Sequence, residues 1–241
     1  AVAVFGGDGS ILSVVAALGD CVVPLGLIPG GTMNVLARDI GIPMETAVAV
    51  DIIANGRIEA IDMAFVNDQP FLCNSEIGFM THLARTREKL RELPWWRRWP
   101  AMVVQGFELL RTYPRLRVTL DADGQAYRVR TRAIVVSNNL LSDAPGPIPP
   151  RRSLNAGVLG IYIARDTSFW GLLRLAARMV AGSWQKEDSL EVISAKSVVL
   201  SLDRPLLLSV MNDGEASQLQ TPLHYTMRAR ALRVLVPPNR S

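Results

Sequence analysis

Apolar residues at the start of the chain form two units of the same kind. Residues 1–18 read as an apolar strand, a glycine-rich turn and an apolar helix, and residues 21–40 repeat this order. A further helix is predicted over residues 45–55. Because each strand is followed by a glycine loop and a helix, the pattern predicts a parallel α/β layer whose ligand binds at the carboxyl ends of the strands.

The pattern changes after Gly56 to short β-rich runs separated by turn residues. Strands are predicted over residues 58–66, 69–75, 115–121, 127–137, 158–164, 190–202, 205–211 and 231–236. Helices are predicted over residues 82–93, 101–112 and 169–184, with residues 94–100 as a loop between the first two. Short strands joined by hairpin turns predict a second, mostly antiparallel domain that packs as a β-sandwich.

The expected fold class is therefore α/β, with a truncated Rossmann-like domain followed by a mostly antiparallel β-sandwich domain. We place the first domain at residues 1–60 and the second at residues 61–241, with the closing strand as a candidate to return to the first domain. The first domain begins one strand before its glycine loop. This leaves no room for a preceding strand and helix, and it predicts that the N-terminal strands are missing.

Composition limits the class of protein. The 241 residues are 49% hydrophobic and 20% charged, as in an ordinary globular protein. The sequence has no apolar run of the roughly 18 residues that a membrane span needs, and no charged and apolar leader, so we expect a cytoplasmic protein. Cys21 and Cys73 lie far apart in apolar surroundings, which favours free buried thiols over a disulfide or a zinc site.

The first glycine loop has the chemistry of a phosphate-binding site. Gly6, Gly7 and Gly9 let the main chain come close to a ligand, and the N–H groups at the start of the following helix can bind an anion. Asp8, which lies among them, could hold Mg²⁺ or accept a proton. A tight turn without a ligand would give the same pattern, and Thr32 in the second loop could be a phosphate contact or only a helix cap.

A second acidic motif lies late in the chain, at Asn212-Asp213-Gly214-Glu215. Its Asp-Gly pair predicts a hairpin turn. Asp213 and Glu215 could also meet Asp8 across a cleft, as in sites that hold a metal ion.

Residues 94–100 combine tryptophan with arginine in a basic part of the chain. Between residues 85 and 117 there are nine basic and three acidic residues. A peripheral membrane contact would use tryptophan rings at the headgroup level and guanidinium groups on lipid phosphate, here from Trp95, Trp96, Arg97, Arg98 and Trp99. Packing of these tryptophans between helices is the alternative, and nucleic acid is a weaker one because no motif for it accompanies the patch.

Five motifs resemble, in their order, the catalytic region of one enzyme family. They are Gly6-Gly7-Asp8-Gly9-Ser10, Ile28-Pro29-Gly30-Gly31-Thr32-Met33-Asn34, Gly41-Ile42-Pro43, Ile61-Asp62-Met63 and Asp213-Gly214-Glu215. The order spans nearly the whole chain and is similar to that of the diacylglycerol kinases, lipid kinases that include sphingosine kinases and bacterial relatives. The resemblance implies a Rossmann-like nucleotide-binding domain followed by a β-sandwich, and ATP-dependent phosphorylation of a lipid hydroxyl with Mg²⁺.

The resemblance also implies roles for the motif residues. Glu215 would accept the proton of the lipid hydroxyl, with Asp213 beside it, and Asp8 would share the base role or, like Asp213, hold Mg²⁺. The residues implied to bind ATP are Gly6, Gly7, Asp8, Gly9, Ser10, Gly31, Thr32 and Asn34. The enzyme would act on a diacylglycerol-like lipid as a peripheral protein at the inner face of the membrane.

Three positions depart from the family pattern. Ser10 replaces a usual Thr and keeps its hydroxyl, and Gly31 replaces a usual Leu. Ala156 stands where bacterial relatives usually carry an Asp that ligates a structural Mg²⁺. Because a methyl group cannot bind a hard cation, we expect this second metal site to be absent or to be built from other oxygens.

Two other functions stay open. NAD kinases, which act on a soluble substrate, share the Gly-Gly-Asp-Gly motif, and Ala156 would also suit a non-catalytic module that binds nucleotide or lipid. The tryptophan and arginine segment and the late Asp-Gly-Glu motif favour the lipid kinase. The sequence specifies neither the lipid nor the oligomeric state.

Overall fold

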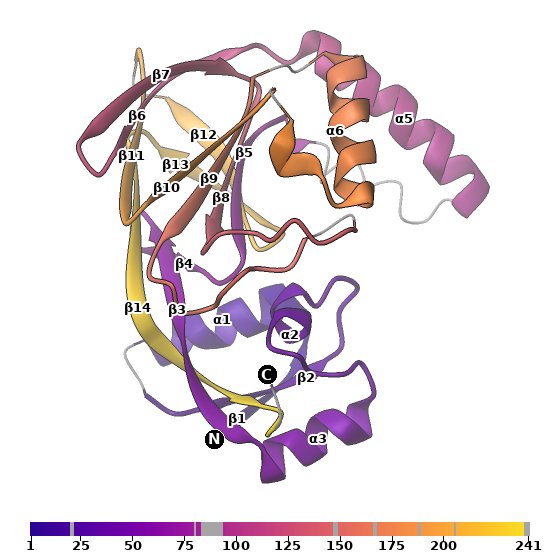
Figure 1. Ribbon diagram of the computed structural model, residues 1–241, viewed down its shortest axis with the longest axis vertical. Coiled ribbons are helices and arrows are strands. Elements are labelled where there is room, and N and C mark those ends of the chain that lie inside the picture. Colours follow the sequence, from indigo (N-terminus) through magenta and orange to yellow (C-terminus); the bar gives the residue numbers. More distant parts are fainter. Residues whose placement is uncertain are drawn as a thin grey trace.

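The computed structural model describes residues 1–19, 22–79, 81–82, 94–146, 149–165, 168–187, 189–204 and 206–238. Its first lobe lies at the bottom of Figure 1 and contains β1 (Val2–Gly6), α1 (Asp8–Leu18), β2 (Leu25–Pro29), α2 (Val35–Asp39) and α3 (Thr46–Asn55). β1 and β2 pair in parallel, and a glycine loop follows each of them. This lobe therefore has the strand, loop and helix order that the apolar pattern predicts.

The second lobe is a sandwich of two sheets with helices outside it. Its first elements are β3 (Arg57–Val66), β4 (Gln69–Phe71), β5 (Asn74–Gly78), α5 (Trp95–Thr112), β6 (Leu116–Ala122), β7 (Gln125–Thr131), β8 (Ala133–Asn138) and β9 (Leu159–Ala164). They are followed by α6 (Phe169–Ala181), the 3₁₀ turn η1 (Trp184–Lys186), β10 (Leu190–Ala195), β11 (Ser197–Leu202), β12 (Leu207–Asn212), β13 (Glu215–Gln220) and β14 (Leu223–Val236).

One sheet extends through both lobes. Its strand order is β1-β2-β14-β11-β6-β7, with β3 beside β14 and β4 beside β3, while the second sheet has the order β10-β9-β8-β5-β12-β13. The long strand β14 pairs with β3 and β11 in the sandwich, and near its end Val234 pairs in parallel with Leu25 of β2 (Figure 1). Between Arg228 and Leu232 the register of β14 against β3 shifts. The expected fold class, an α/β domain followed by a mostly antiparallel sandwich, is confirmed.

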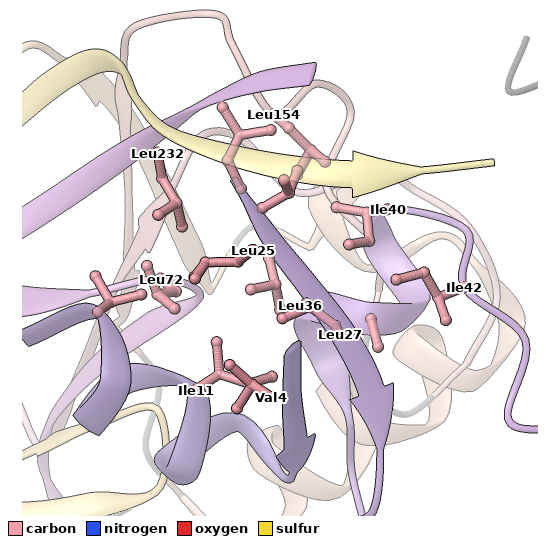
Figure 2. Close-up of a cluster of buried hydrophobic side chains, with 14 of the residues drawn as sticks. Val4, Ile11, Leu25, Leu27, Leu36, Ile40, Ile42, Leu72, Leu154 and Leu232 are labelled. Atoms are coloured by element: carbon pink, nitrogen blue, oxygen red, sulfur yellow. The ribbon is translucent and has the colours of Figure 1, made fainter. Parts of the chain in front are cut away.

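Each lobe has an apolar core, and the core of the first lobe is closed by the second. Figure 2 shows Val4 and Ile11 packed with side chains of β2 and α2. The second lobe contributes to this cluster from β3 and, on three other segments, through Leu72, Leu154 and Leu232. The first lobe therefore buries its apolar face only when the sandwich lies against it.

Three runs that the sequence predicts as single strands each contain two strands in the structure, and the two strands belong to different sheets. Residues 69–75 divide into β4 and β5, residues 127–137 into β7 and β8, and residues 190–202 into β10 and β11. The prediction of one strand in each run is wrong. In two of the three runs a single residue, Arg132 or Lys196, is all that lies between the two strands, so the sequence shows no loop there. Residues typical of strands lie on both sides of each break, while the backbone turns from one sheet to the other.

The predicted loop over residues 94–100 is also wrong. Helix α5 begins at Trp95, with Pro94 at the N-cap, and it contains Pro100. Proline is tolerated at the start of a helix, and one inside it removes a single backbone hydrogen bond. Leu109 packs α5 against the six-stranded sheet. The helix is therefore held by tertiary packing that the local sequence does not reveal.

Some predictions fall on residues that the structure does not describe. Most of the helix predicted over residues 82–93 lies outside the described residues, and so does Cys21. Cys73 is buried and free. Within the described ranges, no helix combines the length and the apolar character that crossing a bilayer requires.

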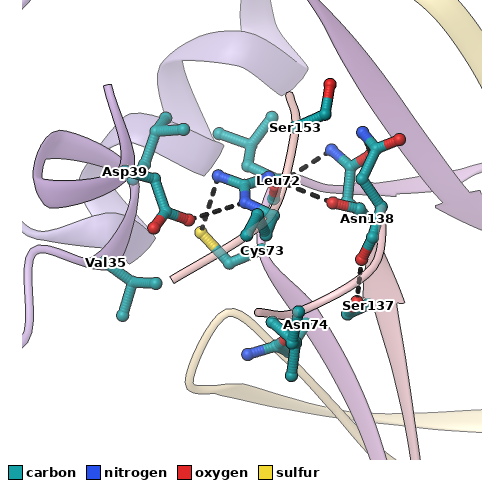
Figure 3. A network of polar contacts seen from close by, with 12 residues as sticks. Val35, Asp39, Leu72, Cys73, Asn74, Ser137, Asn138 and Ser153 are labelled. Atoms are coloured by element: carbon teal, nitrogen blue, oxygen red, sulfur yellow. Dashed lines mark hydrogen bonds and ion pairs between the residues drawn. The ribbon is translucent and has the colours of Figure 1, made fainter. Parts of the chain in front are cut away.

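A buried ion pair joins the two lobes. Arg151 donates from Nε to Asp39 at the end of α2, over 2.6 Å, and from Nη1 to the carbonyl oxygen of Leu72, also over 2.6 Å (Figure 3). The two charged side chains are 2% and 5% exposed. Burial acts to lower the pKa of Arg151, but the negative groups around it, Asp39 and Asp213 among them, raise that pKa overall.

Replacing one partner of this pair should destabilise the protein. Arg151→Met leaves the Asp39 carboxylate buried without its cation, and the loss in free energy of unfolding should be about 3–5 kcal/mol. Urea unfolding measures it. Arg57→Met is the matched control, because Arg57 forms an exposed pair with Glu59 and should cost less than about 1 kcal/mol. Equal, small losses in both variants would show that the Arg151 pair does not hold the lobes together.

Candidate functional site

The two glycine loops lie against each other at the carboxyl ends of β1 and β2. Gly30 donates its N–H to the carbonyl oxygen of Gly6 over 2.9 Å. A Cβ atom on Gly31 would lie 2.5 Å from the Cα of Gly7, so side chains are excluded where the loops cross. The expected phosphate-binding residues of both loops are thus brought together, with Ser10 and Thr32 exposed.

Asp8 ties the first loop to the helix that follows the second. Its two carboxylate oxygens accept hydrogen bonds from the N–H groups of Val35 and Leu36, each over 3.0 Å. Asn34, at the N-cap of α2, has a φ of 47° and bonds with its amide group to both N–H and C=O of Gly31. The reading of Thr32 as the cap is wrong, since Asn34 holds that position and Asp8 accepts the exposed N–H groups of the helix.

The late acidic motif forms the tight turn between β12 and β13. Both central residues have positive φ, 50° at Asp213 and 91° at Gly214, as in a type I′ hairpin. The Asp213 carboxylate accepts three backbone hydrogen bonds, from the N–H groups of residues 72, 73 and 74, over 2.6 to 2.9 Å. Burial raises the pKa of Asp213 to about 6, although these hydrogen bonds act to lower it.

The turn carries Glu215 to the first glycine loop. A Cβ atom on Gly9 would lie 2.5 Å from Oε1 of Glu215, so the carboxylate rests against the start of α1. Glu215 is exposed and is also one of the residues that line a pocket of about 260 Å³ between α1, β4 and the β12–β13 hairpin. The structure therefore brings together the glycine loop and the Asp-Gly-Glu motif, which are about 200 residues apart in the sequence.

Asp62 of β3 is a third aspartate that accepts backbone hydrogen bonds, and it is fully buried. Its oxygens accept from the N–H of Gly157 over 2.6 Å, from the N–H of Arg230 over 2.8 Å and from the side chain of Asn139 over 3.0 Å. It lies beside the segment that carries Ala156 and fixes the point where the register of β14 shifts. Its contacts are those of a residue that positions the backbone.

The described residues offer few free oxygens to a metal ion. In the ranges that the structure covers, no group of three or more Asp, Glu, His or Cys side chains is arranged to hold one. A carboxylate has about four lone-pair sites. Asp8 uses two of these lone pairs and Asp213 uses three. Both carboxylates can therefore still contribute an oxygen to a metal ion, and Asp8 has more free lone pairs than Asp213. Mg²⁺ usually takes one or two carboxylates, with substrate phosphates and water as the other ligands, and such a set fits this site.

Sequence reasoning missed two charged groups near the turn. Arg151 is one, and Glu76 of β5 is the other. Burial, and then the negative charge of Asp213, raise the pKa of Glu76 to about 7. The sequence could have indicated Glu76, because it is a glutamate within the mostly apolar residues 71–79. Cys73 lies within electrostatic reach of Asp8 and Asp213, and burial raises the pKa of its thiol well above the usual value.

Comparisons with known proteins agree with this arrangement. The model of the diacylglycerol kinase catalytic domain matches residues 1–66, and the model of the YegS C-terminal NAD kinase beta sandwich-like domain matches residues 81–236. A diacylglycerol kinase of Mycobacterium tuberculosis is 30% identical over 98% of this chain and 77% of its own length. The chain belongs to the diacylglycerol kinase family.

Other proteins of this family are similar over the same extent. A diacylglycerol kinase of Bacillus subtilis is 27% identical over 98% of this chain and 77% of its own length. A crystal structure of a diacylglycerol kinase from Bacillus anthracis matches with a TM-score of 0.68 and 22% identity, over 98% of this chain and 76% of that one. The diacylglycerol kinase resemblance inferred from the motifs is thereby confirmed.

The half-buried Glu76 should make stability depend on pH. Its pKa is about 7 in the folded protein and 4.5 in ordinary surroundings, so the stability it contributes is complete below about pH 4.5 and is lost as the pH rises through 7. Glu76→Gln stays neutral and should therefore be more stable than the unchanged protein at pH 8, by about 2–3 kcal/mol, and similar to it at pH 4.5.

Urea unfolding at several pH values measures this difference. Glu45→Gln, at the exposed N-cap of α3, is the control for the substitution itself. If the Glu76→Gln difference does not change between pH 4.5 and pH 8, Glu76 ionises in the folded protein as it does in water.

Proposed function

We propose that this protein is an ATP-dependent kinase that transfers the γ-phosphate to a hydroxyl group of a diacylglycerol-like lipid. The observation that carries the proposal is the contact between Glu215 and Gly9, because it sets a proton acceptor beside the loop that would hold the phosphate donor. Membership of the diacylglycerol kinase family supports the reaction class.

The glycine loops would bind the nucleotide phosphates. Backbone N–H groups at the start of α1 and the positive end of the helix favour an anion there, and Gly6, Gly7 and Gly9 leave room for it. The exposed hydroxyls of Ser10 and Thr32 would add side-chain contacts. Asn34 would act indirectly, because its side chain fixes the backbone of Gly31.

Glu215 would act as the general base. It would take the proton of the acceptor hydroxyl as the oxygen forms a bond to the γ-phosphorus, while the bond from that phosphorus to the bridging oxygen of ADP breaks. The products are the phosphorylated lipid, ADP and one proton. Asp213 would hold the turn, so that Glu215 stays at this distance from Gly9.

Mg²⁺, when bound, would neutralise the charge of the transferred phosphate. Asp8 and Asp213 are the carboxylates that would hold it, through the lone pairs that their backbone hydrogen bonds leave free. Asp8 lies within the glycine loop and is the nearer of the two to the phosphate-binding N–H groups along the chain.

The helices outside the sandwich would contact the membrane. Trp96 of α5 is 56% exposed and Trp170 of α6 is 74% exposed, and Leu173 and Val180 of α6 are exposed as well. The side chains of Trp95, Arg97, Arg98 and Trp99 lie outside the described part of the structure. Exposed tryptophan on helices that carry arginine suits a peripheral contact with anionic lipid, here at the inner face of the membrane.

The reaction can be tested with a mixture of lipids. The full-length protein, ATP labelled in the γ-phosphate, Mg²⁺ and a bacterial lipid extract should give a labelled lipid. Glu215→Gln should slow this transfer by about 10²–10⁴-fold, because the base is lost, while ATP binding measured by calorimetry stays unchanged. Glu191→Gln, on the distant strand β10, is the matched control.

A Glu215→Gln variant with the full rate would remove Glu215 from the mechanism. If the unchanged protein binds ATP but labels no lipid, it acts on a soluble acceptor or is a non-catalytic module.

Membrane contact is tested by sedimentation with lipid vesicles. Binding should be stronger to vesicles containing phosphatidylglycerol than to pure phosphatidylcholine, and should weaken as salt is added, because the attraction is partly electrostatic. Trp96→Ala and Trp170→Ala should each reduce binding several-fold. Phe5→Ala removes an exposed ring from the first lobe and should have no effect. Equal binding by all variants would exclude α5 and α6 as the contact.

A further inference from the structure

The groups of the proposed reaction lie on two lobes. The glycine loops and Asp8 belong to the first lobe, whereas Asp213 and Glu215 belong to a hairpin of the second. A base must lie within hydrogen-bond reach of the proton that it accepts, and a displacement of about 1 Å can cost roughly 10²-fold in rate. A residue that fixes one lobe relative to the other therefore affects the rate without touching the substrate.

In the first lobe, Arg151 holds the end of α2, the helix that follows the second glycine loop. This helix begins where the Asp8 carboxylate accepts the N–H groups of Val35 and Leu36. It ends at Asp39, which accepts a hydrogen bond from Arg151. Charged side chains thus fix both ends of α2, one from within the lobe and one from the other lobe.

In the second lobe, Arg151 and Asp213 bind the same peptide group. The carbonyl oxygen of Leu72 accepts a hydrogen bond from Nη1 of Arg151 over 2.6 Å (Figure 3). The N–H of Cys73, in the same peptide group, donates to Asp213 over 2.8 Å. Hydrogen bonds in such a series polarise and strengthen one another. A series of hydrogen bonds therefore connects α2 to the turn that carries Glu215.

The guanidinium of Arg151 gives this connection a defined geometry. It is planar, so the directions of its bonds to Asp39 and to the Leu72 carbonyl are fixed relative to each other. Asn138 also donates to the Leu72 carbonyl, over 2.9 Å, but it lies on β8 of the same lobe and does not link the lobes through this bond. The apolar contacts between the lobes have no preferred direction.

We propose that Arg151 is a positioning residue for phosphoryl transfer, and that it fixes the hairpin of Glu215 relative to the glycine loops. The inference rests on the proposed function and adds to it a residue outside the reacting groups. Arg151 acts through Asp39 and the Leu72 carbonyl, and its effect on the rate is separate from its effect on stability.

A double variant separates position from stability. Asp39→Leu with Arg151→Met replaces the buried pair by apolar side chains, which is often neutral for stability, and the Leu72 carbonyl keeps its donor from Asn138. The melting temperature should therefore be close to that of the unchanged protein, unlike that of Arg151→Met alone. We expect kcat to fall by about 10–10²-fold, while the Kd of ATP measured by calorimetry changes less than about threefold, because the glycine loops are unaltered.

Arg165→Met with Glu191→Leu is the matched control. This ion pair, at 2.8 Å, joins the end of β9 to β10, at the edge of the six-stranded sheet opposite to β13. The control should keep both kcat and the Kd of ATP. An unchanged kcat in the double variant of Asp39 and Arg151 overturns the inference. A kcat that falls together with ATP affinity and melting temperature also overturns it, because that result is a loss of the fold.

Arg151→Lys decides the question if the double variant does not fold. Lysine keeps a cation beside Asp39 but replaces the planar fork by one nitrogen, so kcat should fall at unchanged ATP affinity. A full kcat in this variant overturns the inference.

A distance measurement separates this inference from the kinase reaction. Spin labels replace the exposed Ala17 of α1 and Gln218 of β13 in a Cys21→Ser background, in which Cys73 is buried. Pulsed electron paramagnetic resonance should show that the double variant shifts or widens the distance distribution by at least about 1 Å. If it does so but no lipid is ever phosphorylated, the proposed function fails and the positioning by Arg151 stands. If the distribution is unchanged, the inference is wrong.

Discussion

Three aspartate carboxylates hold the backbone around the candidate site by accepting N–H hydrogen bonds from segments far away in the sequence. Asp8 binds the start of α2, Asp62 binds Gly157 and Arg230, and Asp213 binds residues 72 to 74. Hydrogen bonds to a charged acceptor are stronger than those between neutral groups. The glycine loops, the shifted part of β14 and the hairpin turn therefore all depend on one kind of interaction.

The polar residues of the site divide into two groups by what their atoms already bind. Asp213 and Asn34 spend their hydrogen bonds on the backbone, so they define where other groups lie. Glu215, Ser10 and Thr32 are exposed, and in the proposed reaction they are the side chains that would meet a substrate. Such a division keeps reactive groups few and their supports rigid, which is what phosphoryl transfer requires, since it depends on positioning more than on covalent chemistry.

Motif order and apolar periodicity were enough to predict the fold class, the two glycine loops and the hairpin turn. They could not show where strands change sheet, because residues typical of strands continue on both sides of Arg132, alternating with polar residues before it and nearly continuous after it. Nor could they show that Arg151 pairs with Asp39, since the two residues meet only when the lobes are packed together.

The place of β14 in the sheet has a consequence for how the protein is made. This strand lies between β2 and β3, yet among the strands that the structure describes it is the last along the chain. At about 5–20 residues per second, the ribosome needs roughly 10–40 s to add the nearly 200 residues between β2 and β14. Throughout that time the edge of β2 has no partner strand, so the nascent first lobe presents the kind of open edge on which chains aggregate and chaperones act.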